Sequence, residues 1–216
     1  MIANHNVVLV RIGRMGTGPA TSAAEHCYSS FPNIRLALVV GVWGGIPFVK
    51  GESQEILLGD VVISDSLVHY DYARQLPNGQ FIQKDSAYKP KSEVASFLAM
   101  LKTRRGSKSL SDSMEGHLGK LQKKLGCSSA YPGILEDRLF ESSYRHKHHM
   151  PAECSICNGN NNGGASVCEK ALLSTCEDLS CDSGKLITRS RQTENAISSS
   201  YLPVVHFGPV GSGTKS

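Results

Sequence analysis

The first 42 residues of the chain read as a strand, a glycine-rich turn, a helix and a second strand. Residues 6–12 (NVVLVRI) are a β-branched run, and three glycines within residues 13–18 supply a flexible turn. Apolar residues then recur at helical spacing over residues 20–31. Residues 34–42 are a continuous apolar run, which is typical of a strand buried on both faces. This βαβ pattern predicts an α/β fold with a right-handed crossover.

The rest of the chain continues the alternation and is then interrupted. Strands are expected from residue 59, at 80–83 and at 202–207, and apolar stripes predict helices at 92–101 and 110–125, joined by a short polar link at 106–109. Residues 142–200 contain an Asn/Gly-rich tract and few aromatic or branched side chains. Such a stretch buries too little to offset its ordering entropy, so we expect a mostly disordered insertion there.

Composition excludes several classes of protein. A chain of 216 residues with 40% hydrophobic content suits a single globular domain. No apolar run approaches the roughly 20 residues of a membrane span, and the N-terminus lacks the layout of a secretory signal. The net charge of +4 is mild, and the densest basic stretches lie beside helical patterns. We therefore expect a cytoplasmic protein that binds neither membranes nor nucleic acids.

Two glycine-containing turns are candidate ligand loops. Gly16 and its neighbours stand between a strand and a helix, where free N–H groups favour an anion. Their spacing is not G-x-G-x-x-G, and a tight turn is the alternative. Gly44 and Gly45 follow the buried run, where open α/β sheets bind ligands; a β-turn is the alternative there. The histidines on expected strands, His69 and His206, read as packed side chains, so no catalytic set is assembled from the residues alone.

Seven cysteines and a histidine-rich stretch raise the question of zinc. Cys154 and Cys157 have the C-x2-C spacing that zinc sites use, and His146, His148 and His149 lie just upstream. The later pair is spaced x4, and no helix or hairpin pattern holds the group. Free thiols in a reducing compartment are therefore the favoured interpretation, with no metal, and zinc is the alternative. The later cysteines of this cluster are Cys168, Cys176 and Cys181.

Landmarks in chain order resemble the nucleoside phosphorylase/uridine phosphorylase superfamily. HNVVLVRIGRMGT (5–17), SAAEHCYSSFPNIRLALVVGVWGG (22–45) and LLGDVVIS (57–64) resemble the fungal branch that heads NACHT, ankyrin and TPR receptor-like proteins. Later landmarks are Tyr131–Gly133, Asp137–Glu141, Cys181–Arg189, Pro203–Gly208 and Gly211–Gly213. A C-x2-C-like pair is common in that branch, which would account for this pair without metal.

The resemblance implies a three-layer α/β/α fold around a mixed sheet and N-glycosidic cleavage of a purine nucleoside or uridine. The oxocarbenium-like transition state of that reaction gains from a carboxylate at the base or ribose. Phosphate is a possible co-substrate, no other cofactor is implied, and family members often form homo-oligomers. The substrate-binding positions implied are Gly16 and Thr17 at the nucleophile, Gly41, Trp43, Gly44 and Gly45 at ribose and base, and Val210 and Gly213 beside the base.

Departures from the family pattern argue against catalysis. Trp43 stands where the branch has glycine, and an indole there should fill part of the pocket or displace the loop. Val39 stands where some bacterial-type members have a phosphate-binding arginine. The chain is expected to be one partial domain (1–216), because the family's first strand and its Glu-Met-Glu segment are not in it. We thus expect nucleoside binding with impaired cleavage and no catalytic residue, or alternatively a non-enzymatic sensing module or a decayed gene product.

Overall fold

The computed structural model describes residues 5–14, 16–48, 55–69, 73–75, 81–83, 87–126, 133, 136–150, 154–158, 166–193 and 201–213. The chain divides into two compact units. The first unit comprises Met1–Gly45, Val62–Leu110 and Val205–Ser216, and the second comprises Ile46–Val61 and Ser111–Val204. Each unit is described by itself.

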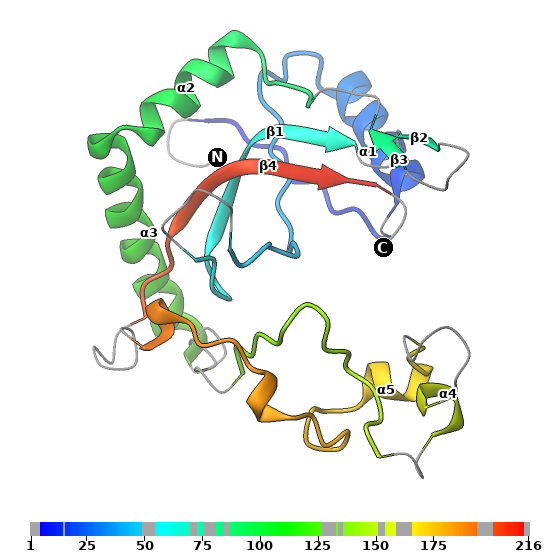
Figure 1. Ribbon diagram of the computed structural model, residues 1–216. Helices are drawn as coiled ribbons and strands as arrows, with labels where there is room; N and C mark the ends of the chain where they lie inside the picture. Colours follow the sequence, from blue (N-terminus) through cyan, green and yellow to red (C-terminus); the bar gives the residue numbers. More distant parts are fainter. Residues whose placement is uncertain are drawn as a thin grey trace. The chain divides into compact units, whose positions relative to one another are not determined.

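A small parallel sheet lies at the centre of the first unit. Strands β1 (Val61–His69) and β4 (Val205–Ser212) run side by side in the same direction (Figure 1). A short antiparallel pair, β2 (Ala73–Gln75) and β3 (Phe81–Gln83), forms a second sheet in which Arg74 is opposite Ile82. Helix and strand are therefore mixed, as an α/β class requires, and the expected strands near 59, 80–83 and 202–207 are present.

Helix α2 (Ser92–Lys102) is anchored in the first unit by its buried Leu98 and by its last residue. The Lys102 ammonium lies 2.6 Å from a carboxylate oxygen of Asp65 on β1 and 5.5 Å from the ring centre of Phe207 on β4. The contact with Lys102 lowers the pKa of Asp65. One side chain thus joins the helix to both strands of the parallel sheet.

Helix α3 (Arg104–Leu125) begins earlier than the apolar stripe indicates. The hydroxyl of Thr103 accepts a hydrogen bond from the Gly106 backbone N–H at 3.1 Å and donates one to the Met100 carbonyl at 2.7 Å. A threonine in this position satisfies a free N–H group of the first turn. The expected link at 106–109 is therefore helical, and the two helices are separated by Thr103.

Two expected strands are wrong. The structure assigns no strand to residues 6–12 or to 34–42, although helix α1 (Thr17–Ser30) between them forms as expected. The apolar run that should be buried on both faces is exposed instead, with Val40 91% and Val42 104% exposed. Strand formation needs a neighbouring strand, and within the described residues neither segment belongs to a sheet.

The second unit carries the most deeply buried side chains. Cys157, Cys168, Ala171 and Leu179 form a hydrophobic cluster, around the short helices α4 (Ser155–Asn158) and α5 (Glu169–Leu173). A 3-10 turn, η2 (Ser183–Lys185), follows. These elements lie within residues 142–200, and the expected disorder of that range stays a prediction. The expectation counted aliphatic and aromatic residues, whereas cysteines supply much of this core.

Leu179 offers a direct test of that core. It is 1% exposed and packs against the cysteines, so Leu179→Ala is expected to lower the free energy of unfolding by about 2–5 kcal/mol. Leu172→Ala, at a position that is 68% exposed, is the matched control and should change stability by less than about 0.5 kcal/mol. Urea denaturation followed by circular dichroism measures both. Equal effects of the two substitutions would show that the cluster does not form.

Candidate functional site

The Gly16–Thr17 turn is built as an open helix start. Gly16 precedes α1 with φ 121° and ψ 161°, a conformation that favours glycine. Glycine has no side chain to cap the helix, so the first N–H groups of α1 can receive a ligand. A Cβ at Gly16 would lie 3.9 Å from Pro19, so backbone conformation rather than space restricts this position. Whether this turn binds an anion stays a prediction.

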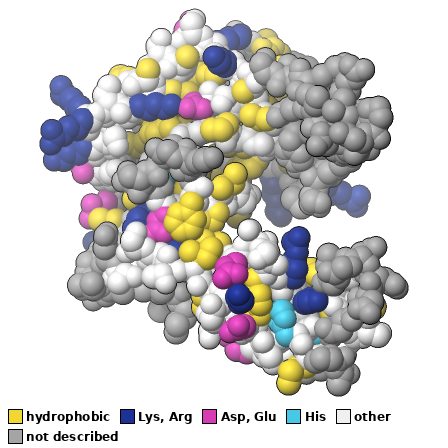
Figure 2. All heavy atoms as spheres, in the orientation of Figure 1, with side chains coloured by type: hydrophobic (Ala, Val, Ile, Leu, Met, Phe, Trp, Pro, Cys, Tyr) yellow, Lys and Arg dark blue, Asp and Glu magenta, His cyan; other side chains and the backbone are white. Residues whose placement is uncertain are grey.

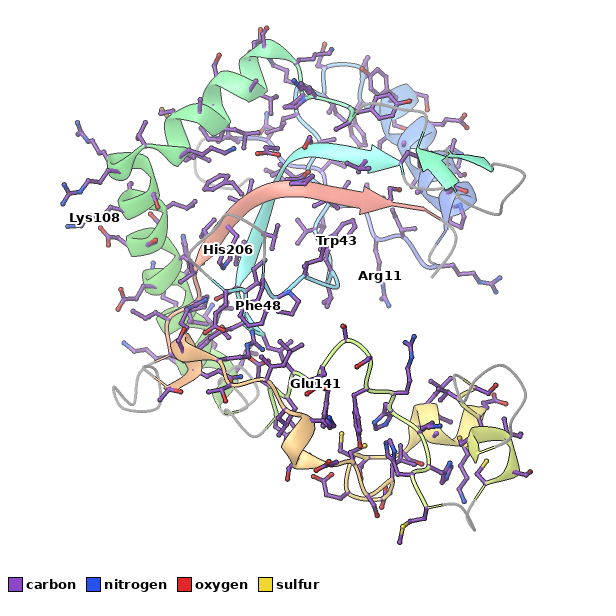
Figure 3. The ribbon with its side chains drawn as sticks, viewed as in Figure 1. Arg11, Trp43, Phe48, Lys108, Glu141 and His206 are labelled. Carbon is purple, nitrogen blue, oxygen red and sulfur yellow. The ribbon has the colours of Figure 1, made fainter. Side chains whose placement is uncertain are left out.

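The Gly41–Gly45 segment lies outside any sheet, and Trp43 is 52% exposed. A Cβ built at Gly41 would lie 3.8 Å from the indole nitrogen of Trp43, so the indole ring lies beside the backbone of Gly41. Figure 3 labels Trp43 in the first unit. The structure thus brings Gly41 and Trp43 together. Whether the indole occupies a nucleoside pocket stays a prediction.

The third predicted segment ends strand β4. Val210 is half-buried on the strand, and Gly213 follows its last residue. His206 on the same strand is 7% exposed, in keeping with a packed side chain. All eight predicted substrate-binding positions belong to the first unit. They lie at the start of α1, in the Gly41–Gly45 segment and at the end of β4.

A different group of residues has ligand geometry. Four donors from the second unit converge: His148, Cys154, Cys157 and Cys168 place one ligand atom each within 4.8 Å of one another. His148, Cys157 and Cys168 are buried and Cys154 is half-buried. The Nδ1 atom of His148 lies 3.5 Å from the sulfur of Cys157 and 3.5 Å from that of Cys168. Figure 3 shows sulfur atoms gathered near α4 and α5.

Local structure holds these donors in place. Cys154 directly precedes α4, Cys157 lies within its single turn, and Cys168 caps α5. The Ala171 backbone N–H donates to the Cys168 sulfur at 3.4 Å, and Lys147 donates to the Cys157 carbonyl at 2.8 Å. Short helical turns and these two hydrogen bonds thus hold the segments that carry the cysteines.

The thiols affect one another's protonation. Burial by itself would raise the pKa of Cys157, but hydrogen bonding by the Cys168 backbone and by His148 outweighs it and lowers the pKa to about 6. The Ala171 N–H favours the Cys168 thiolate, yet burial and the Cys157 and Cys154 thiols outweigh it and raise the pKa of Cys168. One thiolate therefore disfavours the next in this space.

A second set of donors lies in the same unit. His146, Cys176 and Cys181 are half-buried, and their ligand atoms also lie within 4.8 Å of one another. The Nδ1 atom of His146 is 3.8 Å from the Cys176 sulfur and 3.7 Å from the Cys181 sulfur. Its Nε2 lies 3.0 Å from the Ser174 carbonyl oxygen. Figure 2 shows histidine side chains (cyan) on the visible face near this region.

The sequence indicated a cluster of cysteines and histidines, but not its division into two ligand groups. The C-x2-C spacing indicated that Cys154 and Cys157 belong together. Nothing in the spacing showed that His148 joins them, whereas His146, two residues earlier, joins the x4 pair. His149 belongs to neither group and stacks on Tyr144 with ring centres 4.8 Å apart. The x4 spacing was the available signal for a second, separate group.

Residues that carry the family resemblance meet in a buried ion network. Arg189 Nη1 lies 2.8 Å from Asp137 Oδ1, and the two side chains are 4% and 5% exposed. The other Asp137 oxygen accepts from the Leu58 backbone N–H at 3.1 Å. Asp60, a further landmark, is paired by Arg191, and its carboxylate also accepts from the Val204 backbone. These landmarks hold the second unit together rather than forming a ligand site.

Comparison with known proteins adds one relationship. No family model matches the chain, and no solved structure matches it. Among curated proteins, a "Nucleotide-binding leucine-rich repeat (NLR)-like protein" of Hyaloscypha variabilis is 40% identical over 63 residues. The chain is similar to part of an NLR-like protein. The matched stretch covers 29% of this chain and 6% of that relative. The similarity is consistent with a fungal NLR-type receptor.

Within the described residues, no helix combines the length and apolar character that crossing a membrane requires.

Proposed function

We propose that the chain is a nucleoside phosphorylase-like domain that binds a purine nucleoside or uridine in an NLR-type receptor protein. The observation that carries the proposal is the chain order of the sequence landmarks, from residue 5 to Gly213. The similarity to an NLR-like protein supports the receptor context, because the resembled branch heads proteins of that kind. The open start of α1 supports the placement of an anion such as phosphate at Gly16 and Thr17.

The matched positions favour binding over bond cleavage. An oxocarbenium-like transition state needs negative charge near the ribose, and none of the eight proposed binding residues carries a carboxylate. Trp43 supplies an aromatic face on which a nucleobase can stack, at a position that is half exposed. We therefore expect saturable nucleoside binding with no measurable release of free base.

Two assays on the purified chain test the proposal. Differential scanning fluorimetry with adenosine, inosine and uridine is expected to show stabilisation by at least one nucleoside, and chromatography is expected to show no free base with or without phosphate. Release of base would show that cleavage persists. Stabilisation by none of the three would contradict nucleoside binding itself.

A glycine substitution tests the anion-binding turn. Gly16→Val is expected to weaken nucleoside binding at least tenfold, because a β-branched residue rarely adopts the positive φ of this position and the turn would change its conformation. Gly13→Val is the matched control, since a Cβ there meets no atom within 4 Å and its backbone is not in the left-handed region. Isothermal titration calorimetry measures both affinities. Equal affinities for the two variants would place the ligand away from Gly16.

A second candidate function is favoured by the NLR-like relative. The domain would then act as a sensing or interaction module, in which nucleoside occupancy changes stability or association without chemistry. Both candidates predict binding without turnover, so association is the property that separates them. A change in the oligomeric state on adding the nucleoside, measured by size-exclusion chromatography with light scattering, would support sensing, whereas an unchanged state would support binding alone.

A further inference from the structure

We propose that the second unit is a zinc-binding module in which His148, Cys154, Cys157 and Cys168 coordinate one Zn²⁺ ion. The proposal is independent of nucleoside binding, since its ligands all belong to the second unit and the nucleoside positions to the first. Three sulfur donors and one imidazole form a set that tetrahedral structural zinc sites use.

The donor distances match a tetrahedral ion. Zinc lies about 2.3 Å from sulfur and about 2.0–2.1 Å from nitrogen, which places neighbouring sulfur and nitrogen ligands about 3.6 Å apart. Both sulfur–nitrogen distances at His148, to Cys157 and to Cys168, are 3.5 Å. A hydrogen bond between one thiol and the imidazole would explain one of these two sulfur–nitrogen distances, but not both. One ion at their centre accounts for the convergence of all four donors within 4.8 Å.

The apolar core of the second unit is small within the described residues. Its largest fully buried side chains are Leu179 and Cys157, and the cluster around them consists mainly of cysteines and alanine. Small modules with so little buried hydrocarbon depend on metals or disulfides. Within the described part of the chain no disulfide joins these cysteines, and metal coordination is a cross-link that their positions allow.

The His146, Cys176 and Cys181 group carries a second zinc ion with one open position. Its sulfur–nitrogen distances of 3.8 and 3.7 Å are close to the tetrahedral value. The Nε2–H of His146 donates to the Ser174 carbonyl, which fixes the tautomer that leaves Nδ1 free to ligate. Three protein ligands at a half-buried site leave a fourth position for water.

Metal content of the full chain tests both ions. Protein purified without chelator, or refolded with zinc chloride, is expected to hold two zinc ions per chain by inductively coupled plasma mass spectrometry. Replacement by cobalt(II) chloride should give the visible bands of tetrahedral cobalt and thiolate charge-transfer bands. His148→Ala and Cys181→Ser should each lose one ion and keep the other. Cys27→Ser, on α1 in the first unit, should keep both.

Conservative variants separate coordination from folding. His148→Cys keeps four donors and is expected to restore the ion that His148→Ala loses, whereas a purely structural role for the histidine would not be rescued by cysteine. One zinc per chain, unaffected by Cys181→Ser, would overturn the second ion alone. A folded, zinc-free chain that takes up no cobalt, or a disulfide between Cys154 and Cys157 found by mass spectrometry, would overturn the proposal.

Discussion

Asp137→Ala is expected to lower the free energy of unfolding by about 3–5 kcal/mol. Asp137 and Arg189 are almost fully buried and lie 2.8 Å apart. Removing the carboxylate leaves the guanidinium in a dry environment with Glu55, at 3.5 Å, as its remaining acidic partner. The same substitution also deprives the Leu58 backbone N–H of its acceptor.

An exposed ion pair of the same unit supplies the control. Glu141 and Lys185 lie 3.5 Å apart with side chains 47% and 46% exposed. Glu141→Ala should therefore change stability by less than about 1 kcal/mol, because water replaces the lost partner. Urea denaturation by circular dichroism measures both variants. A loss at Asp137 as small as that at Glu141 would show that the pair is solvated and that the network does not hold the unit.

Zinc removal is expected to open the second unit. If the free zinc concentration exceeds the dissociation constant about a thousandfold, binding stabilises the folded form by about 4 kcal/mol. That stabilisation lowers the population of the open form about a thousandfold. Cleavage of a transiently opened segment follows that population when reclosing is fast. Trypsin should therefore cut at Lys170 and Arg189 at least tenfold faster after chelation.

Trypsin sites in the first unit provide the internal control for this experiment. Lys102 and Arg105 are exposed near the junction of α2 and α3, and their cleavage should not depend on zinc. Zinc, but not magnesium, should restore protection at Lys170 and Arg189 after chelation. Unchanged cleavage at those two sites after complete zinc removal would contradict a stabilising metal.

The helices were the most predictable part of the fold. Residues 92–101 were expected to be helical, and α2 spans Ser92–Lys102, because apolar spacing and the first-turn Glu93 are local signals. Helix α3 was found but began earlier, since Thr103 caps it through a side-chain contact that the apolar stripe does not show. Local chemistry thus located the helices to within a few residues.

Strand formation depended on pairing with other strands, which the local sequence does not specify. β4 forms beside β1, and both were expected. Residues 34–42 have a stronger apolar run than either, yet the structure gives them no ladder and leaves Val42 fully exposed. A hydrophobic run specifies a strand only where another strand accepts its hydrogen bonds.

The candidate metal ligands were recognised as residues but not as two sets. Asp137 and Arg189, 52 residues apart, likewise meet only in the folded chain. Spacing rules describe ligands held by one hairpin or helix, whereas His148 and Cys168 are 20 residues apart in the chain. Their grouping is visible only in the folded chain.

The most direct test of nucleoside binding is hydrogen–deuterium exchange of the zinc-loaded chain with and without saturating adenosine, inosine or uridine. We expect slower exchange at the backbone amides of residues 16–18, 41–45 and 210–213 with at least one of these nucleosides. Exchange at the zinc-ligand segment 154–168 is expected to stay unchanged. Exchange that is the same at all three loops with every nucleoside would contradict a nucleoside-binding domain.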